Sequence, residues 1–119
     1  MAESIVLDKS KSFALRIVTL YKCLCDDRKE YVMSKQLLRC GTSIGANISE
    51  AEYSMSKREF ISKMNISLKE AAETEYWLEL LHNSKYIAIR EYASIISDCR
   101  EIISLLVSII KTANENLKK

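Results

Sequence analysis

Several carboxylates and one histidine give this chain side chains that could hold a pair of metal ions inside a helical bundle. They are Glu50, Glu70, Glu73, Glu75 and His82. Di-iron sites in bundles place a Glu-x-x-His motif on each of two helices and add glutamates from two more. We expect no Glu-x-x-His motif in this chain and therefore no di-metal site. We expect Glu50, Glu70 and Glu73 to pair instead with Arg39, Lys69 or amide groups, at the surface or at a helix interface.

Nucleophilic catalysis is the second chemistry to consider, and it needs a nucleophile, a base and an orienting group. The thiols are Cys23, Cys25, Cys40 and Cys99. Cys23 and Cys25 stand two apart on a predicted helix, so they point about 200° away from each other and cannot share a metal ion. We expect reduced thiols that are buried or half-buried, no structural zinc, and a solvent-facing His82 at a helix end. The sequence therefore predicts no enzyme, no metal and no cofactor.

The most specific stretch of the chain places two glycines, Gly41 and Gly45, inside a helical pattern. Each glycine costs a helix about 1 kcal/mol relative to alanine. This cost indicates a gain elsewhere, namely another backbone that approaches closely. The segment lacks the length and the lysine of a phosphate-binding loop. It also lacks the apolar surroundings of a membrane GxxxG pair.

A polar row runs beside the core stripe of the same predicted helix. It comprises Gln36, Arg39, Ser43, Asn47 and Glu50. An asparagine near a core stripe costs stability unless it is hydrogen-bonded. Asn47 therefore either satisfies a neighbouring helix or subunit, or it lines a surface for a ligand or a nucleic acid. The sequence leaves both interpretations open.

A second polar row follows on the next predicted helix, with Glu70, Glu73 and Trp77 at spacings of three and four. Tyr76 stands directly before Trp77. Such a tryptophan is typical of a core or a subunit interface, and the alternative is a platform on which bases stack. The two polar rows and the two glycines together form the candidate interface.

The net charge of +2 is small, but the charges are unevenly distributed. Residues 1–40 carry eight Lys/Arg against five Asp/Glu, whereas residues 41–85 carry five against seven. A basic strip in the N-terminal part could contact nucleic acid, and a solvated helix face is the alternative. The strip comprises Lys9, Lys11, Arg16, Lys22, Arg28 and Lys29.

Helices must position these side chains, because the chain has no proline and only two glycines with which to form other turns. Apolar periodicity predicts helices over residues 8–25, 32–53, 56–82 and 89–116. The third begins at a capping box of Ser56 and Glu59, and the polar cluster of residues 26–30 is predicted as a loop. Short loops predict one all-α domain over residues 1–119, an antiparallel up-down-up-down four-helix bundle. Three helices with the first loosely attached are the alternative.

The apolar rows are doubled on the first and last helices. The extra rows are Ala14, Val18, Tyr21 and Cys25, and Ile95, Ile102, Leu105 and Ile109. One bundle seam needs one row, so we expect a homo-oligomer that covers the surplus. No apolar run approaches the ~20 residues of a membrane span, and the start lacks a signal-peptide pattern. We therefore expect a cytoplasmic protein without membrane contact.

Three motifs carry a resemblance to a known family. The first is Gln36, Leu37, Ser43, Ile44, Asn47, Ile48, Glu50 and Ala51; the second is Ser56, Glu59 and Phe60; the third is Lys69, Glu70, Ala71, Glu73, Thr74, Tyr76, Trp77 and Leu78. With these motifs the chain resembles the four-helix-bundle proteins encoded in intervening sequences of bacterial 23S ribosomal RNA genes. The match spans nearly the whole chain.

The resemblance implies a cytoplasmic bacterial homo-oligomer, a ring-like pentamer, with no known enzyme activity. A related branch comprises accessory proteins of diversity-generating retroelements, pentameric barrels that assist a reverse transcriptase by binding nucleic acid. That branch is strongly basic, whereas this chain carries +2. Two functions follow as expectations. One is a nucleic-acid-binding accessory protein, and the other is a scaffold for an unknown protein partner with no nucleic-acid contact.

Overall fold

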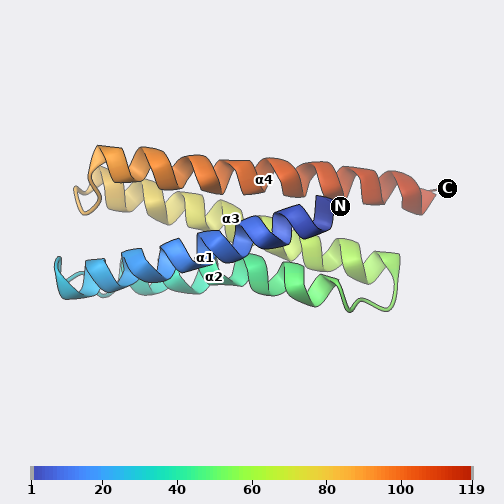
Figure 1. Ribbon diagram of the computed structural model, residues 1–119, viewed down its shortest axis with the longest axis horizontal. Coiled ribbons are helices and arrows are strands. Elements are labelled where there is room, and N and C mark those ends of the chain that lie inside the picture. Colours follow the sequence, from blue (N-terminus) through green and yellow to red (C-terminus); the bar gives the residue numbers. More distant parts are fainter. Residues whose placement is uncertain (1, 119) are drawn as a thin grey trace.

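The computed structural model describes residues 2–118, which form four α-helices and the loops between them. The helices are α1 (Ala2–Asp26), α2 (Met33–Ala51), α3 (Lys57–Asn83) and α4 (Ile89–Lys118). They lie side by side and alternate in direction, so the two chain termini point toward the same end of the bundle (Figure 1). The bundle measures 51 × 21 × 19 Å. The predicted all-α, up-down-up-down four-helix bundle is confirmed.

Helix α1 is longer than its periodicity predicts, since it begins at Ala2 rather than near Asp8. The added residues bury Val6 completely in the core, and this apolar contact keeps the start of the chain helical. α1 packs along α2 and, less extensively, along α4. The alternative of a loosely attached first helix is therefore wrong.

The predicted start of α3 is confirmed, whereas α2 is shorter than predicted. α2 ends at Ala51, two residues before Tyr53. At the start of α3, the Glu59 amide donates to the Ser56 hydroxyl at 3.1 Å, as in a capping box. The Glu59 carboxylate, however, accepts from the amide of Met55 rather than from that of Ser56.

Glu30 caps α2, although the sequence predicts it only as a loop residue in a polar cluster. Its carboxylate accepts hydrogen bonds from the amides of Val32, Met33 and Ser34 at 2.9, 3.1 and 2.6 Å. The Ser34 hydroxyl returns a bond to the Glu30 carbonyl at 2.8 Å. Glu30 is only 7% exposed. The first amides of a helix have no partner within the helix, so Glu30 fixes where α2 begins.

The two glycines of α2 let α1 approach closely, as their positions in the sequence predict. A Cβ atom at Gly41 would lie 2.9 Å from both Cγ atoms of Ile17. A Cβ atom at Gly45 would lie 3.0 Å from the Ser10 Oγ and 3.6 Å from the Ser10 backbone carbon. Ile17 and Ser10 are fully buried. The glycines therefore set the distance between α1 and α2.

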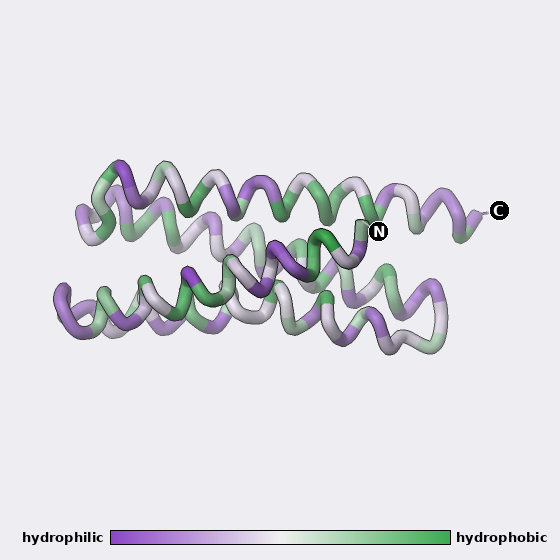
Figure 2. The backbone as a smooth tube through the Cα atoms, viewed as in Figure 1, coloured by the Kyte–Doolittle hydropathy of each residue, from purple (hydrophilic) through white to green (hydrophobic). Residues whose placement is uncertain are grey.

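The surplus of apolar surface is smaller in the folded chain than the sequence predicts. The bundle core takes up the extra row of α4, because Ile95, Ile102 and Ile109 are buried and Leu105 packs half-buried against the core. The extra row of α1 stays half-buried, and Figure 2 shows how hydrophobic residues recur along each helix. The argument for an oligomer therefore depends on α1 alone. None of the helices formed by residues 2–118 has the length and hydropathy that a bilayer crossing requires.

Candidate functional site

The two polar rows meet where α2 and α3 lie side by side. Arg39 of α2 reaches two carboxylates of α3: its Nη1 lies 3.2 Å from Glu70 Oε2, and its Nη2 donates to Glu73 Oε2. Trp77 Nε1 donates to the same Glu73 oxygen at 3.2 Å. We call Arg39, Glu70, Glu73 and Trp77 the α2–α3 cluster. The expected pairing of Glu70 and Glu73 with Arg39 is confirmed.

The charges of the α2–α3 cluster shift one another's protonation. The guanidinium of Arg39 and, after it, the indole N–H of Trp77 lower the pKa of Glu73. Glu73 in turn raises the pKa of Arg39. Two carboxylates around one guanidinium leave the cluster with a surplus negative charge at neutral pH. The Arg39 side chain is 51% exposed, so its ion pairs contribute little to stability and act mainly to orient the side chains.

Ser43, Asn47 and Glu50 of the polar row on α2 bond within their own helix or to α3. Asn47 Nδ2 donates to the Ser43 carbonyl at 2.8 Å, and the Ser43 hydroxyl donates to the Arg39 carbonyl at 2.6 Å. The Asn47 amide therefore bonds one turn back along α2 and not to a neighbouring helix of this chain. Glu50 pairs with Lys63 at 2.8 Å, a partner that the sequence does not single out.

Aromatic side chains border the α2–α3 cluster. Tyr76 is 56% exposed and meets Trp77 edge to face, with ring centroids 5.2 Å apart and planes at 77°. Trp77 is half-buried and packs against the core. Gln36, at the start of the polar row of α2, is exposed. The structure thus packs Trp77 against the core and leaves Tyr76 as the ring that a partner can reach.

Two of the six predicted basic residues face α4 and are neutralised there. Lys9 Nζ lies 3.4 Å from Glu101 Oε1, and Arg16 Nη1 lies 2.7 Å from Asp98 Oδ2. Arg16 Nη2 lies 3.7 Å from a second carboxylate, that of Glu91. These pairs join α1 to α4, so the charges of Lys9 and Arg16 are already engaged within the fold and are not free for a ligand.

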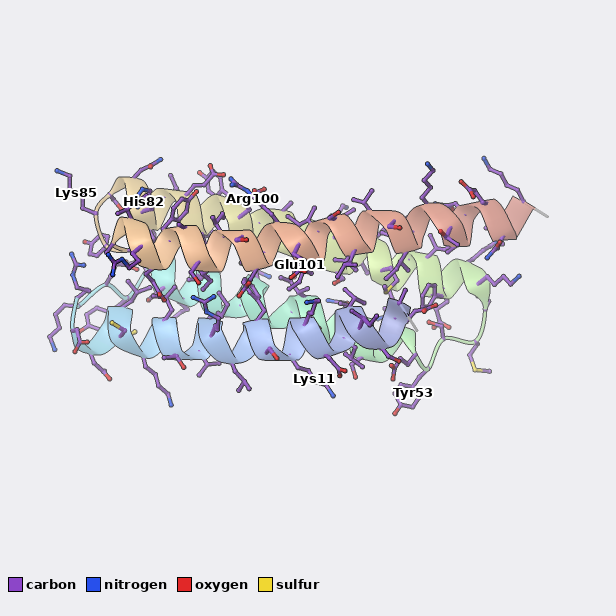
Figure 3. All side chains as sticks on the ribbon, turned by 45° about the horizontal axis from the view of Figure 1, so that its top comes forward. Lys11, Tyr53, His82, Lys85, Arg100 and Glu101 are labelled. Atoms are coloured by element: carbon purple, nitrogen blue, oxygen red, sulfur yellow. The ribbon has the colours of Figure 1, made fainter. Side chains whose placement is uncertain are left out.

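The other four predicted basic residues lie elsewhere, so the six do not form one strip. Lys11 is exposed roughly 160° around α1 from Lys9, and Figure 3 shows it pointing away from α4. Lys22 is exposed on the same side as Lys11, whereas Arg28 and Lys29 lie in the loop after α1. The prediction of a continuous strip is wrong, because charges spaced by two residues fall on opposite faces of a helix.

Three of the four cysteines, Cys23, Cys40 and Cys99, are not activated as nucleophiles. Burial raises the pKa of Cys99 to about 12 and also raises the pKa of Cys40. A hydrogen bond to Asp27 raises the pKa of the exposed Cys23. Reactive cysteines need the opposite shift, because the thiolate is the nucleophile. All four thiols are free; Cys40 and Cys99 are buried and Cys25 is half-buried as predicted, whereas Cys23 is exposed, contrary to the prediction.

His82 lies in the last turn of α3, as predicted, but it is half-buried rather than solvent-facing. Its ring stacks on Tyr92 with centroids 4.3 Å apart and planes at 6°, and Nδ1 lies 3.2 Å from the Ile87 carbonyl. The expectation that the chain has no Glu-x-x-His motif is wrong, because Glu79 and His82 have this spacing. The Glu79 carboxylate, however, lies 3.8 Å from Arg100 Nη2. Residues 2–118 contain no group of three His, Cys, Asp or Glu side chains that could hold a metal ion.

The emission of Trp77, the single tryptophan, should report the protonation of Glu73. Because Arg39 and Trp77 lower the Glu73 pKa, we expect an emission midpoint below the ~4.3 of an ordinary glutamate. Arg39→Ala removes the guanidinium and should raise that midpoint. Fluorescence is measured over the acid range in which circular dichroism shows a folded protein. Arg58→Ala, which removes an exposed cation of α3, is the control and should leave the midpoint unchanged. An unchanged midpoint in Arg39→Ala would contradict the ion pair between Arg39 and Glu73.

Comparison with known proteins agrees with this fold. A family model described as 23S rRNA-intervening sequence protein matches residues 2–108, a range that includes the whole α2–α3 cluster. Among solved structures, a protein of unknown function from the S23 ribosomal protein family of Bacteroides thetaiotaomicron VPI-5482 is similar to this chain. Identity is 60% and the TM-score 0.92, over 93% of this chain and 99% of that chain. No curated protein matches this sequence.

Proposed function

This chain belongs to the family of 23S rRNA-intervening sequence proteins, and we propose that it is a non-enzymatic accessory protein that binds nucleic acid as a homo-oligomer. The oligomer is a pentamer in this proposal and works in the cytoplasm. The raised pKa values of the Cys23, Cys40 and Cys99 thiols and the engaged His82 support a role without catalysis.

The pairing of charges carries the proposal of nucleic-acid binding. Eight ion pairs join five cations to eight carboxylates. Among residues 2–118, this leaves twelve Lys/Arg but only eight Asp/Glu without an ion-pair partner. The charges that remain for a partner are therefore more basic than the net charge of +2 suggests. Unpaired cations are what a phosphate backbone binds.

The extra apolar row of α1 supports assembly. Ala14, Val18, Tyr21 and Cys25 are half-buried in the single chain, and Leu15 beside them is 70% exposed. A contiguous apolar surface that the chain leaves uncovered is typical of a protein interface. A closed ring would repeat each weak phosphate contact in every subunit and so raise the avidity for one nucleic acid.

The same apolar row favours a second function, a scaffold that holds a protein partner and has no nucleic-acid contact. An apolar surface suits a polypeptide, whereas phosphates require cations. The scaffold thus depends on α1, while the accessory function depends on the unpaired cations. The two functions therefore differ in how partner binding depends on the salt concentration.

Binding of the purified protein to structured RNA and duplex DNA across a salt series tests the proposal. Light scattering in the same buffer gives the assembly mass. We expect the logarithm of the association constant to fall with the logarithm of the salt concentration, with a slope of about 0.7–0.9 per phosphate contact. We expect the assembly mass to be that of five chains. No binding at low salt by an intact oligomer would exclude the accessory function and favour the scaffold, which should then retain a polypeptide in a pull-down. A monomeric mass would exclude the oligomer.

A further inference from the structure

Two lysines occupy left-handed backbone conformations, one in each of two loops. Lys29, between α1 and α2, has a φ of 55°, and Lys85, between α3 and α4, has a φ of 71°. No other non-glycine residue among residues 2–118 has a positive φ. Because helices alternate in direction, both loops lie at the same end of the bundle (Figure 1). A side chain with a Cβ atom is disfavoured in this conformation relative to glycine.

Both lysines follow the end of a helix, and Lys85 stands where such an end ordinarily takes a glycine. After α3, the Tyr86 amide donates to the Leu81 carbonyl at 2.8 Å around Lys85, as in a Schellman cap. After α1, the Glu30 amide donates to the Leu24 carbonyl at 2.9 Å around the other lysine. Glycine is strongly enriched at this position. Lysine rather than glycine in the left-handed conformation after both helices therefore indicates that the side chains serve something other than the turn.

Arg28 fastens the two loops to each other. Its Nη1 and Nη2 donate to the carbonyls of Tyr86 and Lys85 at 2.9 and 3.0 Å. Its guanidinium also lies 5.3 Å from the centroid of the Tyr86 ring. The backbone of Lys85 is thereby held, while its side chain projects away from the bundle (Figure 3). The two left-handed lysines are thus part of one connected surface.

Positive charge concentrates on this surface, which we call the loop end and define as residues 22–35 and 84–90. The loop end carries six Lys/Arg against three Asp/Glu, a balance of +3 compared with +2 for the whole chain. The cations are Lys22, Arg28, Lys29, Lys35, Lys85 and Arg90, all exposed and none in an ion pair of the described residues. Of the three acidic residues, Asp26 and Asp27 are exposed, whereas Glu30 is buried as the cap of α2.

An aromatic ring accompanies these cations. Tyr31 lies in the α1–α2 loop, two residues after Lys29, and is 55% exposed. Single-stranded RNA is bound by cations that contact phosphates together with exposed rings on which unpaired bases stack. The loop end combines both elements, whereas the α1–α4 face holds cations already paired with carboxylates.

We propose that the loop end is the surface with which this protein contacts RNA, through the lysines of both loops and the ring of Tyr31. The inference rests on the proposed function, because it assigns a site to the nucleic acid. It moves that site from the α1 helix to the two loops. The unfavourable backbone of Lys29 and Lys85 is then retained because glycine would supply the turn without the charge.

The decisive variant is Lys29→Gly/Lys85→Gly, because glycine relieves the backbone while removing the charge. We expect an equal or higher Tm, roughly tenfold weaker binding to an RNA with an unpaired loop, and a salt slope reduced by about 0.7 per lost contact. Lys57→Gln/Lys111→Gln removes two exposed charges away from the loop end and should change binding little. Tyr31→Ala should weaken binding without changing the salt slope.

The outcomes distinguish a wrongly assigned binding site from a wrongly proposed function. If the wild type binds RNA and the glycine variant binds it equally well, the loop end is not the RNA-binding surface, and the proposed function stands. If the wild type binds no RNA even at low salt, both fail. A lower Tm in the glycine variant would show that the lysines stabilise the fold, which would overturn the argument from the backbone.

Discussion

Gly45→Leu is expected to destabilise the fold by about 1–3 kcal/mol or more, because the leucine overpacks the contact between α1 and α2. Even a Cβ atom at this position would lie 3.0 Å from the buried Ser10 hydroxyl and 3.6 Å from its backbone. The longer side chain must therefore push α1 away from α2. Thermal unfolding should show Tm lowered by about 4 °C for each kcal/mol lost.

Ala46→Leu is the matched control, since Ala46 is the next residue of α2 and is exposed. It adds a side chain of the same size where nothing needs to move, so its Tm should stay close to that of the wild type. If Gly45→Leu unfolds at the wild-type temperature as well, the glycine is not at a packed contact. An unchanged assembly mass in the control would show that its surface lies outside the oligomer interface.

The glycines show which part of a helix contact can be predicted from a sequence and which part cannot. Two glycines in a helical pattern predict a close approach of another backbone, and this contact is confirmed. Their partners, Ser10 and Ile17, could not be predicted, because the register of one helix against another depends on packing in three dimensions. The early start of α1 escaped prediction for the same reason, since Val6 is held by the core of the whole bundle.

The candidate site was predictable in its residues and only partly in its contacts. Glu70 and Glu73 pair with Arg39 as expected, because the rows of two antiparallel helices meet along one seam. Asn47 bonds within its own helix, an outcome that composition and spacing cannot separate from a bond to a neighbour. Periodicity counts apolar rows but does not tell which of them the bundle itself covers. Periodicity therefore overestimated the apolar surface that α4 leaves uncovered.

Net charge proved a weak guide to the electrostatics of this chain. Arg16, Arg39 and Arg100 each meet two carboxylates, so three places along the bundle are locally acidic. The loop end is left with the opposite balance. A chain with a charge of only +2 can thus carry one basic surface, and an RNA ligand would meet that surface rather than the mean charge.

Glu30 shows why a cap can be missed. N-caps are usually serine, threonine, aspartate or asparagine, and Glu30 stands in a cluster of charges that resembles an ordinary loop. Its role appears only when the chain turns back and brings three amides to its carboxylate. The carboxylate is buried, so no solvent can replace it if it is removed.

Glu30→Gln is expected to cost about 1.5–3 kcal/mol at neutral pH, the range for hydrogen bonds to a charged group. The amide keeps one acceptor oxygen but turns its NH₂ group toward amides that also donate. Chemical denaturation followed by circular dichroism measures the loss. Glu52→Gln, at an exposed carboxylate after the end of α2, is the control and should stay within about 0.5 kcal/mol of the wild type.

The pH dependence of the same variant tests the charge of the cap. Burial acts to raise the pKa of Glu30, but the hydrogen bonds from Ser34, Val32 and Met33 outweigh it and lower the pKa. A lowered pKa stabilises the fold fully above the unfolded value of ~4.3, and this stability is lost as pH falls through the folded value. The stability gap between wild type and Glu30→Gln should therefore be constant near neutral pH and shrink below about pH 4. A gap that stays constant down to the acid limit of folding would mean that Glu30 is not a charged cap.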